Sequence, residues 1–346
     1  MAVSLWLNRR NTGRPASRAG RTIRRAAVCA GLGASGVGAP LLAQDAVLPP
    51  RPRITGISHA AFYVNDMAKA REFYEKFLGF ASPFSIPMPA GGDLVWIKIN
   101  DRQTVELFPA SGVEPGAERF YHIALQVDEA EAMRLYLRAR GVAVPATTPT
   151  GRIGNKNFFV RDPSGNTIEI VQYLPDGWTV REQGHHLPDS RISTHMTHVG
   201  IMIAQLDSAA RFYGDILGFR EFWRGSSNGT MLSWVNMRVP EGDDYVEFML
   251  YEKYPPITAV HSMQHVCLEV ANADVAKAIL DHRILPAGSP APSAPRVGRN
   301  GKRQLNYFDP DGTRVELMEP GTVDGQPRPP SEARAPVGER KKAPAP

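Results

Sequence analysis

The 346-residue sequence predicts an α+β protein built from four βαβββ modules in a tandem duplication. The first observation is that residues 57–80 align without a gap with residues 196–219. Two further pairs of segments repeat in the same order: Tyr121–Val127 with Gln264–Val270, and Asp162–Glu169 with Asp309–Glu316. Such internal similarity identifies a repeated structural unit. The remaining observation is the spacing of apolar residues in each unit. At first every second residue is apolar, as in a strand, and then every third or fourth residue, as in a helix.

The first module shows how each element is predicted. Apolar residues alternate along His59–Val64, which is typical of a strand with one buried face. Asp66 is a suitable N-cap for a helix, and Gly79 is placed to end it in the left-handed conformation. Between them, apolar residues recur at spacings of three and four: Met67, Ala70, Phe73, Tyr74 and Phe77. The sequence therefore predicts a strand followed by one helix.

Three strands are expected after each helix, for example around 95–99 and 104–108. The sequences Asp-Pro-Ser-Gly at 162–165 and Asp-Pro-Asp-Gly at 309–312 predict tight turns before a final strand, because Pro and Gly supply the backbone angles of such turns. The modules then cover roughly 55–110, 119–174, 196–252 and 262–319. Which modules pair stays open: the first with the second, or the first with the fourth and the second with the third.

Two domains follow from this arrangement, with distinct segments around them. The predicted boundaries are 55–175 for the first domain, 176–195 for a linker, 196–320 for the second domain, 47–54 for a stiff Pro-rich spacer and 321–346 for a disordered tail. The tail is expected to be disordered because residues 320–346 hold seven Pro and almost no large apolar residue to offset the entropy of ordering.

The first 46 residues are predicted to be a cleavable export signal. Seven Arg precede Ala26–Ala43, a segment without charge that is rich in Ala and Gly. The pair Arg24-Arg25 resembles a twin-arginine signal, so we expect a periplasmic or secreted protein. A basic disordered arm or an Arg-rich transit peptide would have a similar composition.

The charge distribution, the hydropathy and the cysteine content exclude several classes of protein. The net charge of +5 comes from the ends, since residues 54–319 hold 31 acidic and 26 basic residues. A nucleic-acid role is therefore not expected. No apolar run after residue 50 is long enough for a membrane span. Only Cys29 and Cys267 are present, which excludes a disulfide scaffold and a cysteine-built zinc site.

Each module carries a His near the start of its first strand and a Glu in its last strand. The four pairs are His59 with Glu106, His122 with Glu169, His198 with Glu247, and His265 with Glu316. A Glu between apolar neighbours on a half-buried strand is costly unless a partner or a metal neutralises it. Imidazole and carboxylate groups together suit a divalent ion. The recurrence at four equivalent places predicts metal sites, for which Ni, Zn, Fe or Mn are the candidates.

The chain resembles the vicinal oxygen chelate (VOC) superfamily, which includes glyoxalase I, the bleomycin-resistance proteins and extradiol dioxygenases. The motifs are F-Y-x(3)-L-G-F after the first His, H-I-A-L-x-V-D, and D-P-x-G-x(3)-E. The resemblance implies that two modules curl into a cup with a metal at its base. It also implies two ligand sets like those of bacterial-type glyoxalase I: His59, Glu106, His122 and Glu169, and then His198, Glu247, His265 and Glu316.

By the same resemblance, the activity is that of a metal-dependent isomerase or lyase. A ligating Glu would act as the base, so Glu169 and Glu316 are the catalytic candidates. An extradiol-type or other Fe(II) dioxygenase is an alternative, but that family has a further His just upstream of the D-P-x-G turn as the second acid or base, and residues 123–184 and 283–346 contain no His. A non-catalytic binding or resistance protein is another alternative. The expected partner is a small-molecule substrate, with no nucleic acid and no membrane after signal removal, in a monomer or homodimer.

Overall fold

The computed structural model describes residues 49–111, 113 and 117–339. The predicted export signal at residues 1–46 therefore lies outside the described residues. Among the described residues, no helix combines the length and the apolar character needed to cross a bilayer.

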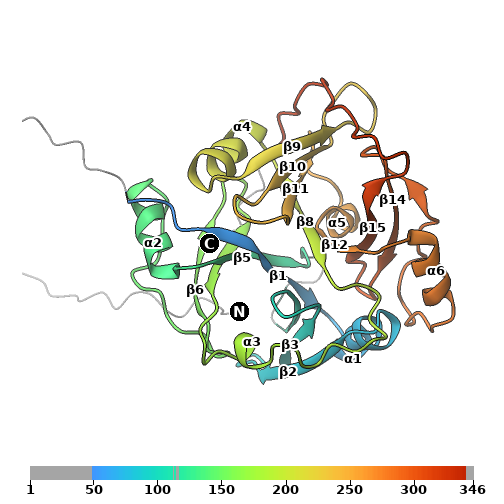
Figure 1. Ribbon diagram of the computed structural model, residues 1–346, viewed down its shortest axis with the longest axis horizontal. Coiled ribbons are helices and arrows are strands. Elements are labelled where there is room, and N and C mark those ends of the chain that lie inside the picture. Colours follow the sequence, from blue (N-terminus) through green and yellow to red (C-terminus); the bar gives the residue numbers. More distant parts are fainter. Residues whose placement is uncertain (1–48, 112, 114–116, 340–346) are drawn as a thin grey trace, which may run out of the picture. The chain divides into compact units, whose positions relative to one another are not determined.

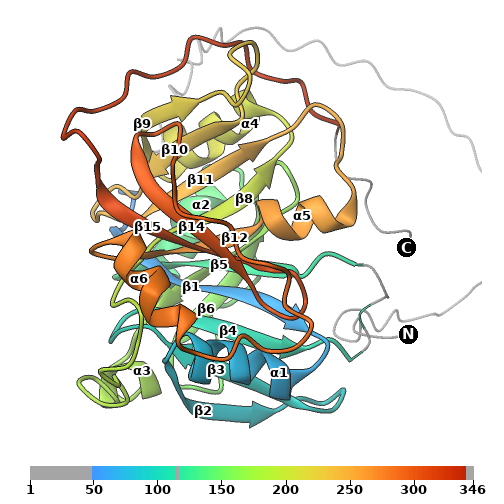
Figure 2. The same ribbon diagram turned by 90° about the vertical axis from the view of Figure 1, so that its right-hand side faces the viewer.

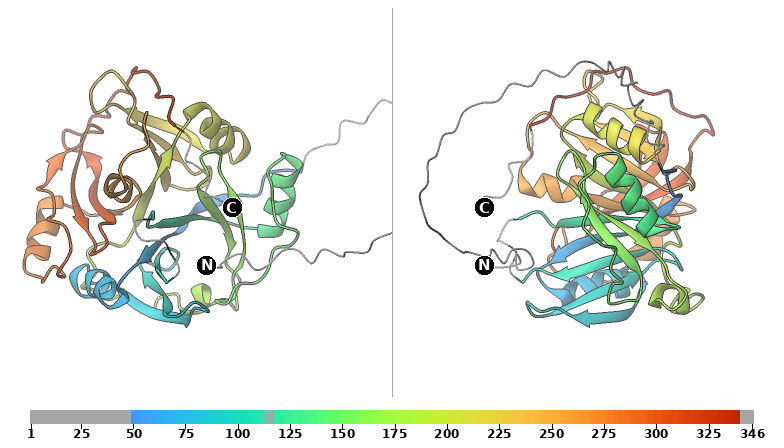
Figure 3. Two further views of the ribbon diagram at one scale, coloured as in Figure 1. Left: turned by 180° about the vertical axis from the view of Figure 1, so that it is seen from behind. Right: turned by 90° about the vertical axis from the view of Figure 1, so that its left-hand side faces the viewer.

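The first two modules form one mixed sheet of seven strands. In the first module the elements are β1 (Ile54–Val64), α1 (Met67–Arg71), the π-helical segment η1 (Glu72–Phe77), β2 (Ala81–Pro87), β3 (Asp93–Lys98) and β4 (Thr104–Pro109). In the second they are β5 (Phe120–Val127), α2 (Ala130–Ala139), β6 (Lys156–Arg161) and β7 (Thr167–Gln172). The strand order is β2-β3-β4-β1-β5-β7-β6. Helix α2 packs against β6 and β7 (Figure 3).

The last two modules form a second mixed sheet, of eight strands, after the short linker helix α3 (Trp178–Arg181). The third module contains β8 (Met196–Ile203), α4 (Leu206–Ala209), the π-helical η2 (Ala210–Ile216), β9 (Arg220–Gly225), β10 (Trp234–Arg238) and β11 (Tyr245–Leu250). Helix α5 (Ile257–Met263) leads to β12 (His265–Glu269), α6 (Ala273–Asp281), β13 (Arg296–Val297), β14 (Lys302–Phe308) and β15 (Arg314–Thr322). The order is β13-β14-β15-β12-β8-β11-β10-β9.

Consecutive modules therefore share a sheet, which settles the pairing that the sequence left open. β1 runs antiparallel to β5, and β8 runs antiparallel to β12, so the first strands of two modules meet at the centre of each sheet (Figures 1 and 2). The last strand of each module runs parallel to its own first strand. Each sheet is curled into a half-barrel, and the predicted α+β class with two cups is confirmed.

The helix signals of the first module act as predicted, with one addition. The Asp66 side chain accepts a hydrogen bond from Lys69 N, and Gly79 has φ +84°. The helix does not stay α-helical, because Leu78 N bonds Phe73 O five residues earlier, as in a π-helix. The second module also differs from the prediction. Only an isolated bridge between Thr150 and Lys156 stands where one of its three later strands was expected.

The two halves of the chain contact each other reciprocally. Tyr213 OH donates to Asp162 Oδ2 at 3.1 Å, and the equivalent Tyr74 lies beside Asp309. Likewise Ala204 N donates to Ser164 Oγ, and the equivalent Asn65 N donates to Asp311 Oδ2. The helix of each odd-numbered module thus faces the Asp-Pro turn of an even-numbered module from the other half. The same pattern of contacts on both sides is the arrangement of a two-fold interface.

A second junction centres on Asp244. Its Oδ2 accepts hydrogen bonds from Ile57 N at 2.8 Å and Gln103 Nε2 at 3.2 Å, both in the first half. Its Oδ1 lies 2.7 Å from His195 Nε2, in the linker. One buried carboxylate therefore ties the first sheet, the linker and the second sheet together.

The tail is not disordered over the described residues, so that prediction is wrong for 321–339. β15 continues to Thr322, and the later segment runs along the second sheet. Leu232 N donates to Arg334 O, and Gly338 N donates to Ala204 O, both at 2.8 Å. The tail is ordered through these backbone hydrogen bonds and through Ala333 and Ala335, whose small side chains pack against the core.

Candidate metal centre

The first cluster consists of His59, Glu106, His122 and Glu169, on four adjacent strands at the middle of the first sheet. His59 lies on β1, and the others lie on β4, β5 and β7. Ala61 is two residues after His59 and so shares its face of β1. It pairs with Glu106 on one side and with His122 on the other. All four residues are at most 5% exposed.

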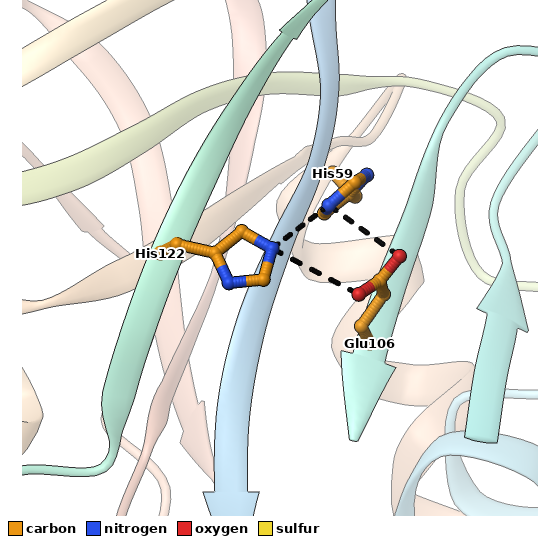
Figure 4. A group of neighbouring side chains, drawn as sticks. All are labelled: His59, Glu106 and His122. Atoms are coloured by element: carbon orange, nitrogen blue, oxygen red, sulfur yellow. Dashed lines mark hydrogen bonds and ion pairs between the residues drawn. The ribbon is translucent and has the colours of Figure 1, made fainter. Parts of the chain in front are cut away.

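Their donor atoms converge. His59 Nε2 lies 3.0 Å from His122 Nε2, 3.1 Å from Glu169 Oε2 and 3.4 Å from Glu106 Oε1. His122 Nε2 lies 3.0 Å from Glu169 Oε2 and 3.8 Å from Glu106 Oε2. Figure 4 shows His59, Glu106 and His122 pointing toward one another from three strands. Ligands at about 2.0–2.2 Å from a metal ion lie roughly 3.0–3.8 Å apart. The donor set therefore fits a divalent ion.

Neighbouring polar groups orient the ligands. Trp96 Nε1 donates to Glu106 Oε1, and Asn157 Nδ2 donates to Glu169 Oε1, each at 2.6 Å. Ser58 Oγ lies 3.0 Å from His59 Nδ1 and 2.5 Å from Tyr173 OH. Fixed outer partners of this kind hold ligand side chains in one rotamer, so the site is organised before any ligand arrives.

The cluster sets the protonation of its members. Burial on its own would raise the pKa of Glu106 and of Glu169. For Glu106 this effect outweighs the charges of the two histidines, so its pKa is raised above the ordinary value. For Glu169 the charges and hydrogen bonds of His59 and His122 outweigh burial and lower the pKa below its ordinary value. Burial lowers the pKa of His59, but the charges of Glu106 and Glu169 leave it raised. The pKa of Glu106 is therefore raised, while the pKa of Glu169 is lowered.

A cavity of about 330 Å³ opens onto the first cluster. Its apolar wall includes Trp96, Phe108 and Trp178, and Trp178 stacks on Phe84 with ring centroids 5.2 Å apart. Its polar lining includes Tyr121, Asn155, Asn157 and Tyr173, together with the His and Glu residues of the first cluster. The cavity has the size and mixed lining of a small-molecule site.

The second cluster consists of the equivalent residues His198, Glu247, His265 and Glu316, on β8, β11, β12 and β15. His198 Nε2 lies 3.1 Å from His265 Nε2, 3.3 Å from Glu316 Oε2 and 3.9 Å from Glu247 Oε2. His265 Nε2 lies 3.5 Å from Glu316 and 3.6 Å from Glu247. The buried thiol of Cys267 is near enough to His198 and Glu316 to form a third group of donors. The separations resemble those of the first cluster.

The surroundings of His265 are different. Its Nδ1 lies 2.8 Å from Met263 O, and Arg314 Nη2 lies 2.8 Å from Nε2 and 2.6 Å from Nδ1. The ring rests on Gly200, where an added Cβ would be 2.1 Å from the ring atoms. The equivalent of Gly200 in the first cluster is Ala61.

These surroundings also change the acidity of the second cluster. Burial and the charge of Arg314 lower the pKa of His265 to about 3. Burial raises the pKa of Glu247, whereas the hydrogen bond from His198 and the positive charge of Arg314 hold the pKa of Glu316 well below its usual range despite burial. The cavity at this cluster is smaller, about 160 Å³, and is lined by Glu247, Glu316 and Arg314 but by neither histidine.

The structure thus brings all eight predicted residues into two clusters of four. Sequence reasoning missed Trp178, which was assigned to the linker, and Arg314. The signal for Arg314 was available, because it lies two residues before Glu316 and therefore on the same face of its strand. The equivalent residue before Glu169 is Thr167.

The sequence matches the Glyoxalase/Bleomycin resistance protein/Dioxygenase superfamily over residues 56–170 and 195–317. A comparison with curated proteins gave no match.

Several solved structures share the fold. The Mn(II)-bound glyoxalase from Novosphingobium aromaticivorans is 18% identical with a TM-score of 0.58, over 83% of this chain and 89% of that one. The 2,3-dioxygenase LapB from Pseudomonas sp. KL28 is 16% identical with a TM-score of 0.58, over 83% and 99%. Homoprotocatechuate 2,3-dioxygenase from Brevibacterium fuscum is 18% identical with a TM-score of 0.56, over 83% and 87%.

At these identities the structures establish a common fold and not a common reaction. The family match, however, covers both halves of the duplication, including the two strands of each half that carry its histidines. The chain belongs to the Glyoxalase/Bleomycin resistance protein/Dioxygenase superfamily, the VOC fold, as a tandem two-domain member.

Proposed function

We propose that this protein is an exported, metal-dependent VOC enzyme that acts as a glyoxalase-like isomerase or lyase on a small substrate with two neighbouring oxygen atoms. The observation that carries the proposal is the convergence of four buried donors in the first cluster at 3.0–3.8 Å, at the base of a cavity of about 330 Å³. Two imidazoles and two carboxylates form a donor set suited to Ni, Zn, Fe or Mn.

His59, His122 and Glu106 are the residues we assign to holding the metal, since these three form one compact group. A bound divalent ion would supply Lewis-acid polarisation of the substrate oxygens. Glu169 is assigned as the base that takes a proton from one substrate carbon and returns it to the next. Its Oε2 faces both histidines, and its other oxygen is fixed by Asn157, which keeps the carboxylate aimed at the base of the cavity.

The cavity wall supports a compact organic substrate. Trp96 and Trp178 supply apolar contact area, and Asn155 and Tyr121 supply polar groups that can orient oxygen atoms. Tyr173, bonded to Ser58 and to Arg102 O, closes the polar side of the cavity behind His59.

The first experiment is the metal content of the untagged protein, purified without chelator and measured by elemental mass spectrometry. We expect stoichiometric metal, lost in His122→Ala. The loaded protein is then incubated with hemithioacetals of a 2-oxoaldehyde and small thiols, and thioester formation is followed by absorbance. In deuterated water, deuterium at the carbon that receives the proton would support the role of Glu169, and Glu169→Gln should abolish product. Protein that stays metal-free after reconstitution would contradict the enzyme and leave a binding protein.

A second candidate is a dioxygenase, and one observation favours it. His59, His122 and Glu106 form a two-His-one-carboxylate group, the ligand set of many non-haem Fe(II) oxygenases. Against it, the cavity lining of the first cluster contains no further histidine to act as a second acid or base. Oxygen uptake with catechols separates the candidates, because isomerisation consumes no oxygen. Uptake that depends on Fe and on His122 would favour the dioxygenase.

Export is the part of the proposal that rests on sequence alone. Its support is the Arg-rich start and the uncharged segment that follows it. Fractionation of expressing cells, with N-terminal sequencing of the product, tests it. A product that begins near residue 44 outside the cytoplasm is expected, and full-length protein confined to the cytoplasm would contradict export.

A further inference from the structure

We propose that only the first cluster binds a metal ion, and that in the second cluster the guanidinium of Arg314 is the resident cation that blocks His265 as a ligand. The inference rests on the proposed function for the first cluster. It goes beyond that function because it assigns the two duplicated sites different contents, although each site keeps its two His and two Glu residues.

The backbone contact of His265 fixes which of its ring nitrogens carries the proton. Met263 O is a carbonyl oxygen and can only accept a hydrogen bond, so the Nδ1 that lies 2.8 Å away must carry the proton. The lone pair of the neutral ring is then on Nε2. Arg314 Nη2 lies 2.6 Å from Nδ1 and 2.8 Å from Nε2, so the guanidinium lies against the face of the ring and not in line with this lone pair. Its positive charge nevertheless lies beside the atom that a metal would bind, where it would repel a second cation.

The ring of His265 also occupies a different position from the ring of His122. His265 and Glu247 both pair with Gly200, as His122 and Glu106 pair with Ala61. A Cβ at Gly200 would lie 2.1 Å from His265 Cε1 and Nδ1, too close for any real contact. His265 thus occupies space that a methyl group fills in the first cluster. The ring fits against the backbone on one side and is covered by Arg314 on the other.

The two cavities differ in whether they reach the histidines of their cluster. The first cavity is lined by both of its histidines, whereas the second is lined by Glu247, Glu316 and Arg314 without either histidine. Arg314 pairs with His265 across β15 and β12, in the register that Thr167 and His122 share across β7 and β5. Arginine and threonine at equivalent positions therefore distinguish the two clusters. The positive charge of Arg314 also favours the ionised forms of Glu247 and Glu316, acting at longer range than a bound ion would.

Native mass spectrometry of the full chain, after loading with Zn²⁺ or Ni²⁺ and removal of excess metal, tests the proposal. Wild-type protein is expected to carry one ion per chain, and Arg314→Thr, which places the residue of the first cluster in the second, is expected to carry two. Two ions in the wild type, whether held through His265 or Cys267, would overturn the proposal. So would an Arg314→Thr protein that binds no more metal than the wild type.

A second pair of variants keeps the test decisive if Arg314→Thr does not fold. His265→Ala is expected to retain the single ion, and His122→Ala is expected to lose it. Loss of metal in His265→Ala overturns the inference. The proposed function fails separately, if the wild type binds no metal. A gain of one ion in Arg314→Thr would support the inference even then, because the gain depends only on the second cluster.

Discussion

Replacing Asp244 with alanine should destabilise the protein by removing the carboxylate that joins the two halves. The change takes away the acceptor for Ile57 N and one of the acceptors for Gln103 Nε2, both buried. Gln103 keeps its bond to Met196 O at 2.9 Å, and His195, which is partly exposed, can bond water instead. The unpaired Ile57 donor and the loss of charged hydrogen bonds together predict a cost of about 2–4 kcal/mol.

The measurement is urea unfolding followed by tryptophan fluorescence, with hydrogen exchange of the Ile57 amide as a local readout. Trp96 and Trp178 report on the first half of the chain, and Trp223 and Trp234 report on the second. Exchange at Ile57 should become faster by roughly 10²-fold, since each 1.4 kcal/mol is about a factor of ten.

The matched control is Asp243→Ala. Asp243 is the preceding residue, its side chain is 92% exposed, and it forms an ion pair with Arg238 at 3.5 Å. Exposed pairs of this kind are worth about 0–1 kcal/mol. If Asp244→Ala lost no more stability than Asp243→Ala, and Ile57 exchanged at the wild-type rate, the reasoning about this junction would be refuted.

Three further changes have defined outcomes. Metal should raise the melting temperature of the wild type but not of His122→Ala, as measured by calorimetry with and without chelator; an equal rise in both would place the metal elsewhere. The hydrogen bond to Asp244 raises the pKa of His195, so this pair stabilises fully below about pH 6.5 and the stabilisation is lost as pH rises through the folded pKa. His195→Gln should therefore cost more free energy of unfolding at about pH 5.5 than at about pH 9, and a constant cost would contradict the pairing. Trp178→Ala should lose about 3 kcal/mol from the cavity wall while keeping metal stoichiometry, and loss of the ion would assign Trp178 a role at the cluster itself.

Local signals in the sequence predicted most of the strands and the first helix, but not the absence of one strand in the second module or the short helices α3 and α5. Asp66 and Gly79 marked the ends of a helix, and alternation along His59–Val64 placed His59 on an inward face. The pairing of modules was beyond sequence reasoning, because all four first strands carry a similar apolar pattern and any two could meet at the centre of a sheet.

The missed residues have different causes. Trp178 lies in a segment rich in Pro and Gly, whose composition indicates a linker, yet its ring packs on Phe84. Arg314 lies outside the recurring His and Glu pattern, because it marks a position at which the two halves differ. The tail was expected to be disordered because it lacks large apolar residues, but Leu232 N bonds Arg334 O, and the small side chains of Ala333 and Ala335 pack against the core.

The reciprocal contacts between the halves have a consequence for how such a protein diverges. In a symmetric dimer of identical chains, every substitution appears in both sites, so a change that removes one metal centre removes the other. Here the equivalent turns at Asp162 and Asp309 keep the same kind of interface, while the two sites are encoded separately. A single codon change at position 314 alters one cup and leaves the partner cup untouched. Fusion of the halves therefore frees one site to specialise without loss of the assembly that supports both.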